Sequence, residues 1–537
     1  MRLFIILFFG ITVAHAQQFD VIIRGGNVHS GSGTKPVVTD IAIRKDTIAA
    51  IGDLSKSKAI KEIDAKGLEV TPGFINMLSW SEVHLLKDGR QMSDIKQGVT
   101  LEILGEGLSP GPRKPRAKDK RWLTLGQFLT FLEKQGVSTN FASFVGATTV
   151  RLYVLDQSDR KPNKEELTQM KNLVAQAMRD GAMGLGTSLI YPPAAFAQTE
   201  ELIELSKVAS SYGGMYITHM RSESDFIYAG LNETFRIAKE ANIAAEIFHL
   251  KINHERNWRK IDTVLYKIDS ARKAGLRITA DVYPYNASGT VLTARLPAWI
   301  QEGGSKEMRK RIVDPALRKK VLYELKMGIP SKNSDPKDVM LLGFKKDSLN
   351  RLYRGKRLDE ISRLHGKDAD ETMLDLLIAD KTAIPSIFFL MSEENVKRFL
   401  KLPYASVGSD AAAYANEPPD NEDGVHPRAY GTFAKILSDY VRDQKVITLE
   451  DAIRKMTSLP ASNLKLKKRG QIATGYFADI AIFDKDKIDD KATYDKPHQY
   501  AEGMKHVFVN GVQVLKDGNH TGARPGRAIR GPGYKRP

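Results

Sequence analysis

Two histidines follow two short apolar segments of the chain, thirty residues apart. His219 follows Met215–Thr218 and His249 follows Ala244–Phe248, and both segments are rich in β-branched and aromatic residues, as buried strands are. The interval matches one unit of a (β/α)8 barrel, where about 250 residues form eight units. Both imidazoles would then lie at the carboxyl ends of neighbouring strands, where such barrels carry their chemistry. Neutral imidazole is a common metal ligand, so the pair predicts a metal site; two separate core histidines are the simpler alternative.

Two acidic residues are predicted at the same end of the barrel. Glu106 follows the apolar segment Val99–Leu104, and Asp410 follows Tyr404–Gly408. Glu106 and the two histidines could give a divalent metal three ligands and leave one position for water, which is the general arrangement of a catalytic zinc site. A metal makes water acidic near neutral pH, and Asp410 could accept and return the proton. The pattern therefore predicts hydrolysis by a metal-activated water.

The middle of the chain predicts an α/β fold, a (β/α)8 TIM barrel over residues 71–465. Eight strand-like segments alternate there with amphipathic helical segments such as Lys164–Asp180, Thr199–Tyr212 and Leu231–Ala241. The gap between the seventh and eighth strands is too long for one helix, so residues 295–370 are predicted to form an inserted helical subdomain over the barrel mouth. The predicted strands are Glu69–Met77, Val99–Leu104, Phe141–Gly146, Met183–Ser188, Met215–Thr218, Ala244–Phe248, Arg277–Val282 and Tyr404–Gly408.

Both ends of this region are flanked by short strand-like segments separated by turns. Residues 17–70 and residues 466–522 each contain such segments, so one small β-sandwich domain is expected to form from both termini. Residues 523–537 are rich in glycine, proline and arginine and are predicted to be an extended basic tail.

The first sixteen residues have the composition of a secretory signal peptide. A basic start is followed by the apolar run 3–13 and by Ala14-His15-Ala16, a typical cleavage site. The run is shorter than the ~20 residues that a membrane-spanning helix needs. We therefore expect cleavage near Ala16, a periplasmic or secreted product and no stable membrane insertion. The chain has no cysteine, which excludes disulfides and thiolate metal ligands.

The chain carries a formal net charge of +17 at pH 7. Its lysines and arginines are scattered and form no basic stripe interleaved with aromatic residues, so nucleic acid is not expected as a partner. The charge favours solubility and attracts anionic small molecules. The sequence does not define an oligomeric state.

An ordered set of segments resembles the D-aminoacylase (N-acyl-D-amino-acid deacylase) family of the metal-dependent amidohydrolase superfamily. The resemblance covers essentially the whole chain after the predicted signal peptide. The segments that carry it are Thr71-Pro72-Gly73-Phe74-Ile75, Gly98-Val99-Thr100, Ile190-Tyr191-Pro192-Pro193, Thr218-His219-Met220-Arg221, His249-Leu250-Lys251, Tyr283-Pro284-Tyr285, Gly408-Ser409-Asp410, His426-Pro427-Arg428-Ala429-Tyr430-Gly431-Thr432-Phe433 and Gly475-Tyr476-Phe477-Ala478-Asp479-Ile480.

Four metal-ligand positions depart from the pattern of this family. Its His-x-His motif after strand one corresponds to Leu78-Ser79-Trp80, its metal-binding cysteine to Gly107 beside Glu106, and its strand-three histidine to Ala147. The resemblance therefore implies one divalent metal instead of two. Zinc is the first candidate, although manganese, iron or cobalt suit the same ligands. The implied ligands are Glu106, His219 and His249, with Asp410 as the catalytic base.

The resemblance also implies that a free α-carboxylate of the substrate is bound by matching side chains, namely Lys251, Arg428, Tyr191 and Ser288. A guanidinium can bind a carboxylate through two parallel hydrogen bonds; ordinary ion pairing at the rim is the alternative for the two basic residues. The expected substrate is a small N-acyl amino acid, of the D series, whose amide bond is hydrolysed. Two alternatives remain: the same chemistry on dipeptides, cyclic amides or N-acyl amino sugars, or an inactive descendant that binds a ligand.

Overall fold

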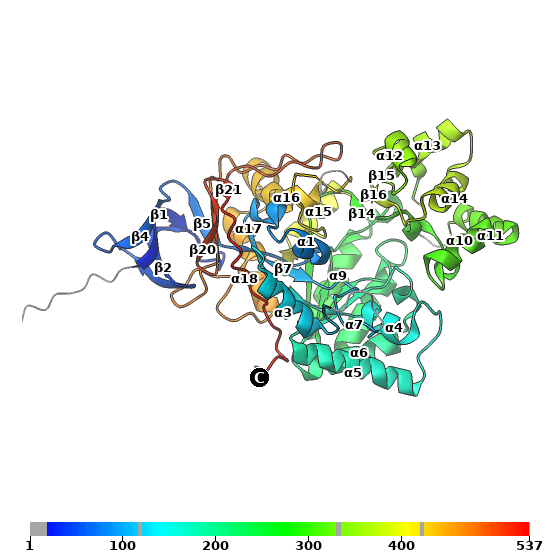
Figure 1. Cartoon of the computed structure of the whole chain (residues 1–537), viewed down its shortest axis with the longest axis horizontal. Helices are drawn as coiled ribbons and strands as arrows, with labels where there is room; N and C mark the ends of the chain where they lie inside the picture. The colour runs from blue at the N-terminus through cyan, green and yellow to red at the C-terminus, as the bar shows by residue number, and fades with distance from the viewer. Residues whose placement is uncertain (1–18, 116–120, 329–333, 419–423, 536–537) are drawn as a thin grey trace, which may run out of the picture.

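The structure is a computed structural model that describes residues 19–115, 121–328, 334–418 and 424–535. The predicted signal peptide lies outside the described residues. The chain forms a barrel, a sheet built from both termini at one end of the barrel, and an inserted unit at the other (Figure 1). Among the helices of the described ranges, none combines the length and the apolar character that a membrane crossing requires.

A parallel β-barrel forms the centre of the molecule. A three-stranded and a six-stranded parallel sheet together supply eight barrel strands, because β8 and β9 are two parts of one strand on either side of Phe144. Hydrogen bonds from Met77 N to Val407 O (3.0 Å) and from Phe144 N to Leu104 O (2.8 Å) join the two sheets. The predicted barrel is confirmed. Its strands are β6 (Phe74–Asn76), β7 (Val99–Leu104), β8 (Asn140–Ser143), β9 (Val145–Gly146), β10 (Gly184–Ser188), β11 (Met215–His219), β12 (Ala244–Ile247), β13 (Ile278–Val282) and β17 (Ala405–Val407).

The first predicted strand is two strands in the structure. β5 (Glu69–Pro72) pairs with β18 (Ile480–Phe483) of the terminal sheet, whereas β6 belongs to the barrel. Gly73 lies between them, and a Cβ there would meet the side chain of Thr100 at 2.2 Å. Only glycine fits where the chain passes from one sheet to the other. The continuous apolar sequence around Gly73 hides this break.

Some of the barrel helices, such as α5 (Lys164–Asp180), have typical capping residues at their ends. α5 follows a capping box between Asn163 and Glu166 and ends at Gly181 in the left-handed conformation. α6 (Thr199–Ser211) matches the prediction, whereas α7 (Ile227–Glu240) begins four residues earlier than predicted. The remaining helices around the barrel are α3 (Leu125–Gln135), α4 (Ala147–Leu155), α9 (Ile261–Lys273), α15 (Glu393–Leu400), α16 (Arg428–Lys435), α17 (Leu449–Met456) and α18 (Ser458–Asn463).

The extra β domain expected from both termini is confirmed, and its nine strands form one hydrogen-bonded sheet. The antiparallel pair β5–β18 joins the amino-terminal strands to the carboxyl-terminal ones. A core of aliphatic side chains, including Ile23, Ile43 and Ile482, lies within the domain. Its other strands are β1 (Phe19–Val28), β2 (Val37–Arg44), β3 (Thr47–Gly52), β4 (Ala59–Asp64), β19 (Met504–Val509), β20 (Val512–Lys516) and β21 (Asn519–His520).

The predicted tail is extended in its backbone but lies against the barrel, near the start of β8. Phe141 donates its N–H to Arg527 O (3.1 Å), and Ile529 donates to Phe141 O (2.8 Å). Buried Asn510 of the terminal sheet donates to both Asn140 Oδ1 (2.7 Å) and Pro525 O (2.8 Å). The tail therefore links the terminal sheet to the amino end of the barrel, opposite the predicted site.

The inserted unit is larger than the predicted range and contains a sheet. Its three antiparallel strands, β14 (Ser288–Val291), β16 (Pro385–Phe388) and β15 (Val339–Leu341), bracket the helices. The unit has a hydrophobic core of its own, which includes Met308, Leu358 and Leu374. The short strands on both sides of the charged helices gave no separate signal in the sequence. The helices are α10 (Ser305–Val313), α11 (Pro315–Lys326), α12 (Asp347–Tyr353), α13 (Leu358–His365) and α14 (Ala369–Asp380) (Figure 1).

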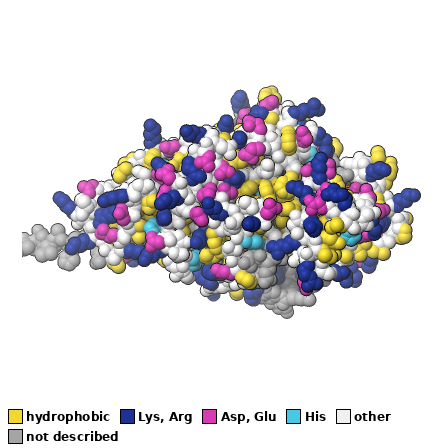
Figure 2. All heavy atoms as spheres, turned by 90° about the horizontal axis from the view of Figure 1, so that it is seen from above, with side chains coloured by type: hydrophobic (Ala, Val, Ile, Leu, Met, Phe, Trp, Pro, Cys, Tyr) yellow, Lys and Arg dark blue, Asp and Glu magenta, His cyan; other side chains and the backbone are white. Residues whose placement is uncertain are grey.

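Charged side chains of both signs are interspersed on the face of the molecule seen in Figure 2. Many charged side chains of the described residues form ion pairs, such as Arg24 with Asp40 (3.1 Å) and Glu62 (2.7 Å). This face therefore carries no continuous basic stripe of the kind that follows a nucleic-acid backbone.

Candidate metal centre and active site

Glu106, His219 and His249 converge on one buried point at the carboxyl end of the barrel. Glu106 Oε1 lies 3.0 Å from His219 Nδ1 and 3.3 Å from His249 Nε2, and the two ring nitrogens are 3.0 Å apart. Three ligand atoms of these residues all lie within 4.8 Å of one another. The three residues lie at or just after the ends of β7, β11 and β12. The structure therefore brings these strand ends together as predicted.

The positions on both sides of Glu106 have no room for a side chain. Gly105 and Gly107 flank Glu106, and both have positive φ angles (100° and 71°). A Cβ at Gly107 would lie 2.1 Å from Ser188 Oγ, and one at Gly105 would lie 2.4 Å from Phe144 O. Because position 107 admits no side chain, the acidic ligand comes from position 106.

A carboxylate that sequence reasoning missed lies behind the two histidines. Glu223 Oε1 is 3.0 Å from His249 Nδ1, and Oε2 is 3.6 Å from His219 Nε2. If His249 donates from Nδ1 to Glu223, the lone pair remains on Nε2, the atom that faces Glu106 and His219. Glu223 follows β11 by four residues and carries no motif, so only the folded chain shows its role.

Lys251 lies in this second layer of contacts. Its Nζ is 2.9 Å from Glu223 Oε1, 3.2 Å from His249 O and 2.6 Å from His249 Nδ1. The side chain is buried and also lies over the ring of Tyr283. The ammonium group thus already has an anionic partner beside the metal centre.

Asp410 is held by a strained turn after β17. Its φ angle is 51°, which is unusual for a residue with a side chain. Ser409 next to it donates its N–H to Asn76 Oδ1 (2.8 Å) and accepts from Asn76 Nδ2 (2.8 Å). His249 also has a positive φ (37°) and donates its N–H to Asp281 (2.9 Å). Such conformations cluster at active sites, and in this chain they also occur in turns, as at Lys45 and Asp517.

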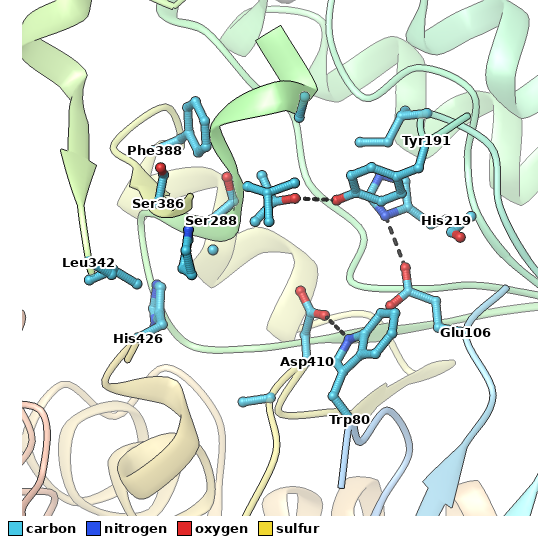
Figure 3. Close-up of a pocket in the computed structure, with 18 of the residues that line it drawn as sticks. Trp80, Glu106, Tyr191, His219, Ser288, Leu342, Ser386, Phe388, Asp410 and His426 are labelled. Carbon is cyan, nitrogen blue, oxygen red and sulfur yellow. Dashed lines mark hydrogen bonds and ion pairs between the residues drawn. The ribbon is translucent and has the colours of Figure 1, made fainter. Parts of the chain in front are cut away.

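Both oxygens of Asp410 have a donor nearby. Trp80 Nε1 donates to Oδ1 at 3.1 Å (Figure 3). Arg428 Nη1 lies 2.8 Å from Oδ2. Arg428 also donates from Nη2 to Gly289 O (3.1 Å), in the inserted unit. Asp410 and Arg428 are both buried.

A cavity of about 1300 Å³ brings the predicted substrate residues to the metal ligands. It is lined by Glu106, His219, Asp410 and the four residues Lys251, Arg428, Tyr191 and Ser288, whereas His249 lies behind its wall. Tyr191 and Ser288 face the same space as Asp410 (Figure 3). Tyr191 OH is 2.5 Å from Thr290 Oγ1 of β14, so the inserted unit supplies one wall of the site.

The donor set fits a divalent metal ion. Burial and the positive charge of Lys251 lower the pKa of His249 well below its usual value, which favours the neutral imidazole that binds metals. Burial and the nearby charge of Asp410 raise the pKa of Glu106 well above its usual value. Its Oε2 is buried without a hydrogen-bond partner among the described residues. A cation at this point would favour the carboxylate and give the buried oxygen a partner.

Comparisons with known proteins agree with this arrangement. A family model described as the amidohydrolase family matches residues 407–515. A D-aminoacylase of Alcaligenes xylosoxydans xylosoxydans is 33% identical over 526 residues, covering 96% of this chain and 98% of the relative. A crystal structure of D-aminoacylase superposes with a TM-score of 0.80 at 32% identity, covering 95% of this chain and 100% of that one. An N-acyl-D-glutamate deacylase from Bordetella bronchiseptica, crystallised with zinc and a phosphonate inhibitor, gives a TM-score of 0.80 at 28% identity, covering 96% of this chain and 100% of that one.

A parallel barrel with two histidines and a carboxylate at its carboxyl end has the architecture of a metal-dependent hydrolase. With this identity over nearly the whole of both chains, the protein belongs to the D-aminoacylase family of metal-dependent amidohydrolases. It is a hydrolase of carbon–nitrogen bonds other than peptide bonds. The predicted family, fold class and enzyme class are confirmed, while the roles of the individual site residues stay predictions.

The contact at Gly107 predicts a specific sensitivity of the metal centre. Gly107→Ala should lower the free energy of unfolding by about 1–3 kcal/mol more than a left-handed alanine alone, because its methyl group overlaps Ser188. It should also reduce metal binding, since Glu106 must move. Urea denaturation and elemental analysis measure the two effects.

Gly475→Ala is the matched control for this substitution. Gly475 also has a positive φ (81°), but a Cβ there would have no heavy atom within 4 Å. It should show only the conformational cost, about 1–2 kcal/mol, and keep its metal. Equal losses of stability in the two variants, with metal retained in both, would show that the Gly107–Ser188 contact is unimportant.

Proposed function

We propose that this protein hydrolyses the amide bond of N-acyl-D-amino acids, using one divalent metal ion held by Glu106, His219 and His249. Zinc is the first candidate, because two imidazoles and a carboxylate suit it. The observation that carries the proposal is the buried convergence of these three ligands beside Asp410 and Arg428 in one cavity. The relatives named D-aminoacylase and N-acyl-D-glutamate deacylase support the substrate class.

One metal is proposed because the first barrel strand offers no ligand. Leu78 is buried in the barrel core, and the indole of Trp80 can only donate. A divalent ion supplies Lewis acidity, which polarises an amide carbonyl and lowers the pKa of a water molecule. The residues of the chain provide the remaining steps.

Asp410 is proposed to move the proton between water and the leaving amine. A carboxylate has about four lone-pair positions, so the contacts with Trp80 and Arg428 leave positions free on Asp410 for a proton. Arg428 and Lys251 are proposed to bind the substrate carboxylate, with Ser288 as a further contact. Burial and the charge of Glu106 raise the pKa of Tyr191, so its hydroxyl stays protonated and can donate to the substrate.

The first test is a screen of purified protein with added zinc against N-acetyl-D- and N-acetyl-L-amino acids, following free amine. Turnover of D over L substrates is expected. Glu106→Ala and His219→Ala should lose metal and activity together. Asp410→Asn should keep the metal and lose roughly 10²–10⁴-fold in turnover, because an amide is no base in this pH range.

His506→Ala is the control for this screen, since His506 lies in the terminal sheet and should affect neither metal nor turnover. Wild-type protein that holds no metal after reconstitution, or a fully active Glu106→Ala variant, would overturn the site assignment. Turnover only of dipeptides, cyclic amides or N-acyl amino sugars would change the substrate class. A metal-loaded protein that is inactive on all of them would indicate a ligand-binding descendant.

A second test concerns the carboxylate contacts. Arg428→Ala and Lys251→Ala should each lower kcat/KM for an N-acyl amino acid about 10- to 100-fold more than for the matching N-acyl amino amide, because a charged hydrogen-bond partner is lost. Arg428 contacts Asp410, and Lys251 contacts Glu223. A fall in kcat/KM that is shared by both substrates therefore indicates that Asp410 or Glu223 has been disturbed. Lys345→Ala, at an exposed cation on the cavity rim, should leave the acid-to-amide ratio unchanged. Equal losses on acid and amide would assign both residues a structural role.

We also propose that the protein is exported and that Ala16 precedes its mature amino terminus. The support is the order of basic, apolar and small residues in positions 1–16. Sequencing the amino terminus of protein from the native cell should find Gln17 first, in the periplasmic or secreted fraction. Intact Met1 on protein in the cytosol would contradict export.

A further inference from the structure

The indole of Trp80 is directed at the proposed catalytic base. Trp80 follows the first barrel strand, and its Nε1 donates to Asp410 Oδ1 at 3.1 Å (Figure 3). Its backbone N–H donates to Ala411 O (3.0 Å), and Asp410 donates its own N–H to Leu78 O (2.9 Å). The two turns are therefore fixed to each other, and the indole has a defined position relative to the carboxylate.

The carboxylate of Asp410 needs such a restraint. Arg428 lies beside the other oxygen, Oδ2, and is itself held by Gly289 O and by the ring of Tyr283 (4.9 Å). Without a donor at Oδ1, the Asp410 side chain could turn further toward Arg428. A neutral donor and a cation on opposite oxygens instead fix the plane of the carboxylate in the cavity.

The chemistry of the indole limits what Trp80 can do in the cavity. Trp80 follows β6 by four residues and lines the cavity. An indole cannot bind a metal, because its nitrogen has only a proton to offer. Its contact with Asp410 is instead a hydrogen bond. A hydrogen bond to a charged acceptor is about twice as strong as one between neutral groups.

We propose that Trp80 is a positioning residue: its indole N–H holds Oδ1 of Asp410 in the orientation required for proton transfer. The kinetic consequence rests on the proposed function, whereas the hydrogen bond can be tested without any substrate. A Trp80 that merely lines the cavity would act through its ring and not through its N–H.

Trp80→Phe removes the N–H and keeps an aromatic ring. With the proposed substrate we expect kcat to fall about tenfold or more, while KM changes less than about threefold and the metal is retained. Trp258→Phe is the matched control, because Trp258 Nε1 donates to a backbone carbonyl, Leu390 O, at 2.9 Å. It loses one indole hydrogen bond of similar length away from Asp410, and kcat should stay within about twofold. A Trp80→Phe variant with metal retained and kcat within twofold of wild type would overturn the proposal.

Replacing Trp80 by β-(3-benzothienyl)alanine also removes the N–H but keeps the shape of the indole ring. This replacement tests the role of the N–H if the phenylalanine variant folds poorly or loses metal. Loss of kcat in both replacements supports the N–H; full kcat in the isosteric replacement contradicts it.

NMR of the indole N–H groups tests the contact directly. The chain has four tryptophans, so ¹⁵N-labelled tryptophan gives few indole signals, and the signal of Trp80 is the one lost in Trp80→Phe. Asp410→Asn should move that signal upfield, because a neutral acceptor binds the proton less strongly, and should leave the signal of Trp258 in place. A Trp80 signal that moves no more than that of Trp258 would overturn the proposal. If wild-type protein lacks turnover, the proposed function fails, and this NMR result still decides the Trp80–Asp410 contact.

Discussion

The strongest constraint in this molecule is the burial of Glu106 against two imidazoles that present their nitrogens to it. Removing a carboxylate from water is costly unless a positive charge or donors compensate. Around Glu106 the charges of Asp410 and Glu223 make the cost larger. The positive charges of Lys251 and Arg428 offset only part of this cost, and Lys251 is paired with Glu223. A divalent cation resolves the conflict, which is why the arrangement indicates a metal centre more strongly than a structural cluster.

Much of the surrounding backbone positions Glu106, His249 and Asp410. Gly105 and Gly107 allow the strand end to pass close to Phe144 and Ser188, so that Glu106 faces the histidines. His249 and Asp410 both have positive φ angles, and each is fixed by a side chain from a neighbouring strand, Asp281 for His249 and Asn76 through Ser409 for Asp410. The strain is local, and the closed barrel supports it.

The sequence predicted the parts of the site that depend on local pattern. Strand periodicity located His219 and His249 at strand ends. A parallel barrel brings the carboxyl ends of its strands together for any conformation of the loops. The sequence did not reveal Glu223 or the Trp80–Asp410 contact, because both depend on distances between separate loops. The break at Gly73 and the sheet of the inserted unit were also missed, since short apolar strands resemble their neighbours in composition. The tail was predicted as extended, but its hydrogen bonds to Phe141 depend on tertiary packing.

The side chains proposed to bind the substrate also contact the groups proposed for catalysis. Arg428 touches Asp410, and Lys251 touches both Glu223 and His249, so the groups proposed to bind the substrate carboxylate also adjust the metal centre. A bound carboxylate would draw these cations away from their present partners. Under the proposed function, binding of the acid end of a substrate would thereby change the charge around Asp410 and Glu106.

Anomalous diffraction from crystals of the zinc-loaded protein, recorded on both sides of the zinc absorption edge, tests the metal assignment most directly. We expect one strong peak about 2 Å from ligand atoms of Glu106, His219 and His249. Two peaks, or a single peak away from these three residues, would contradict a one-metal site held by them.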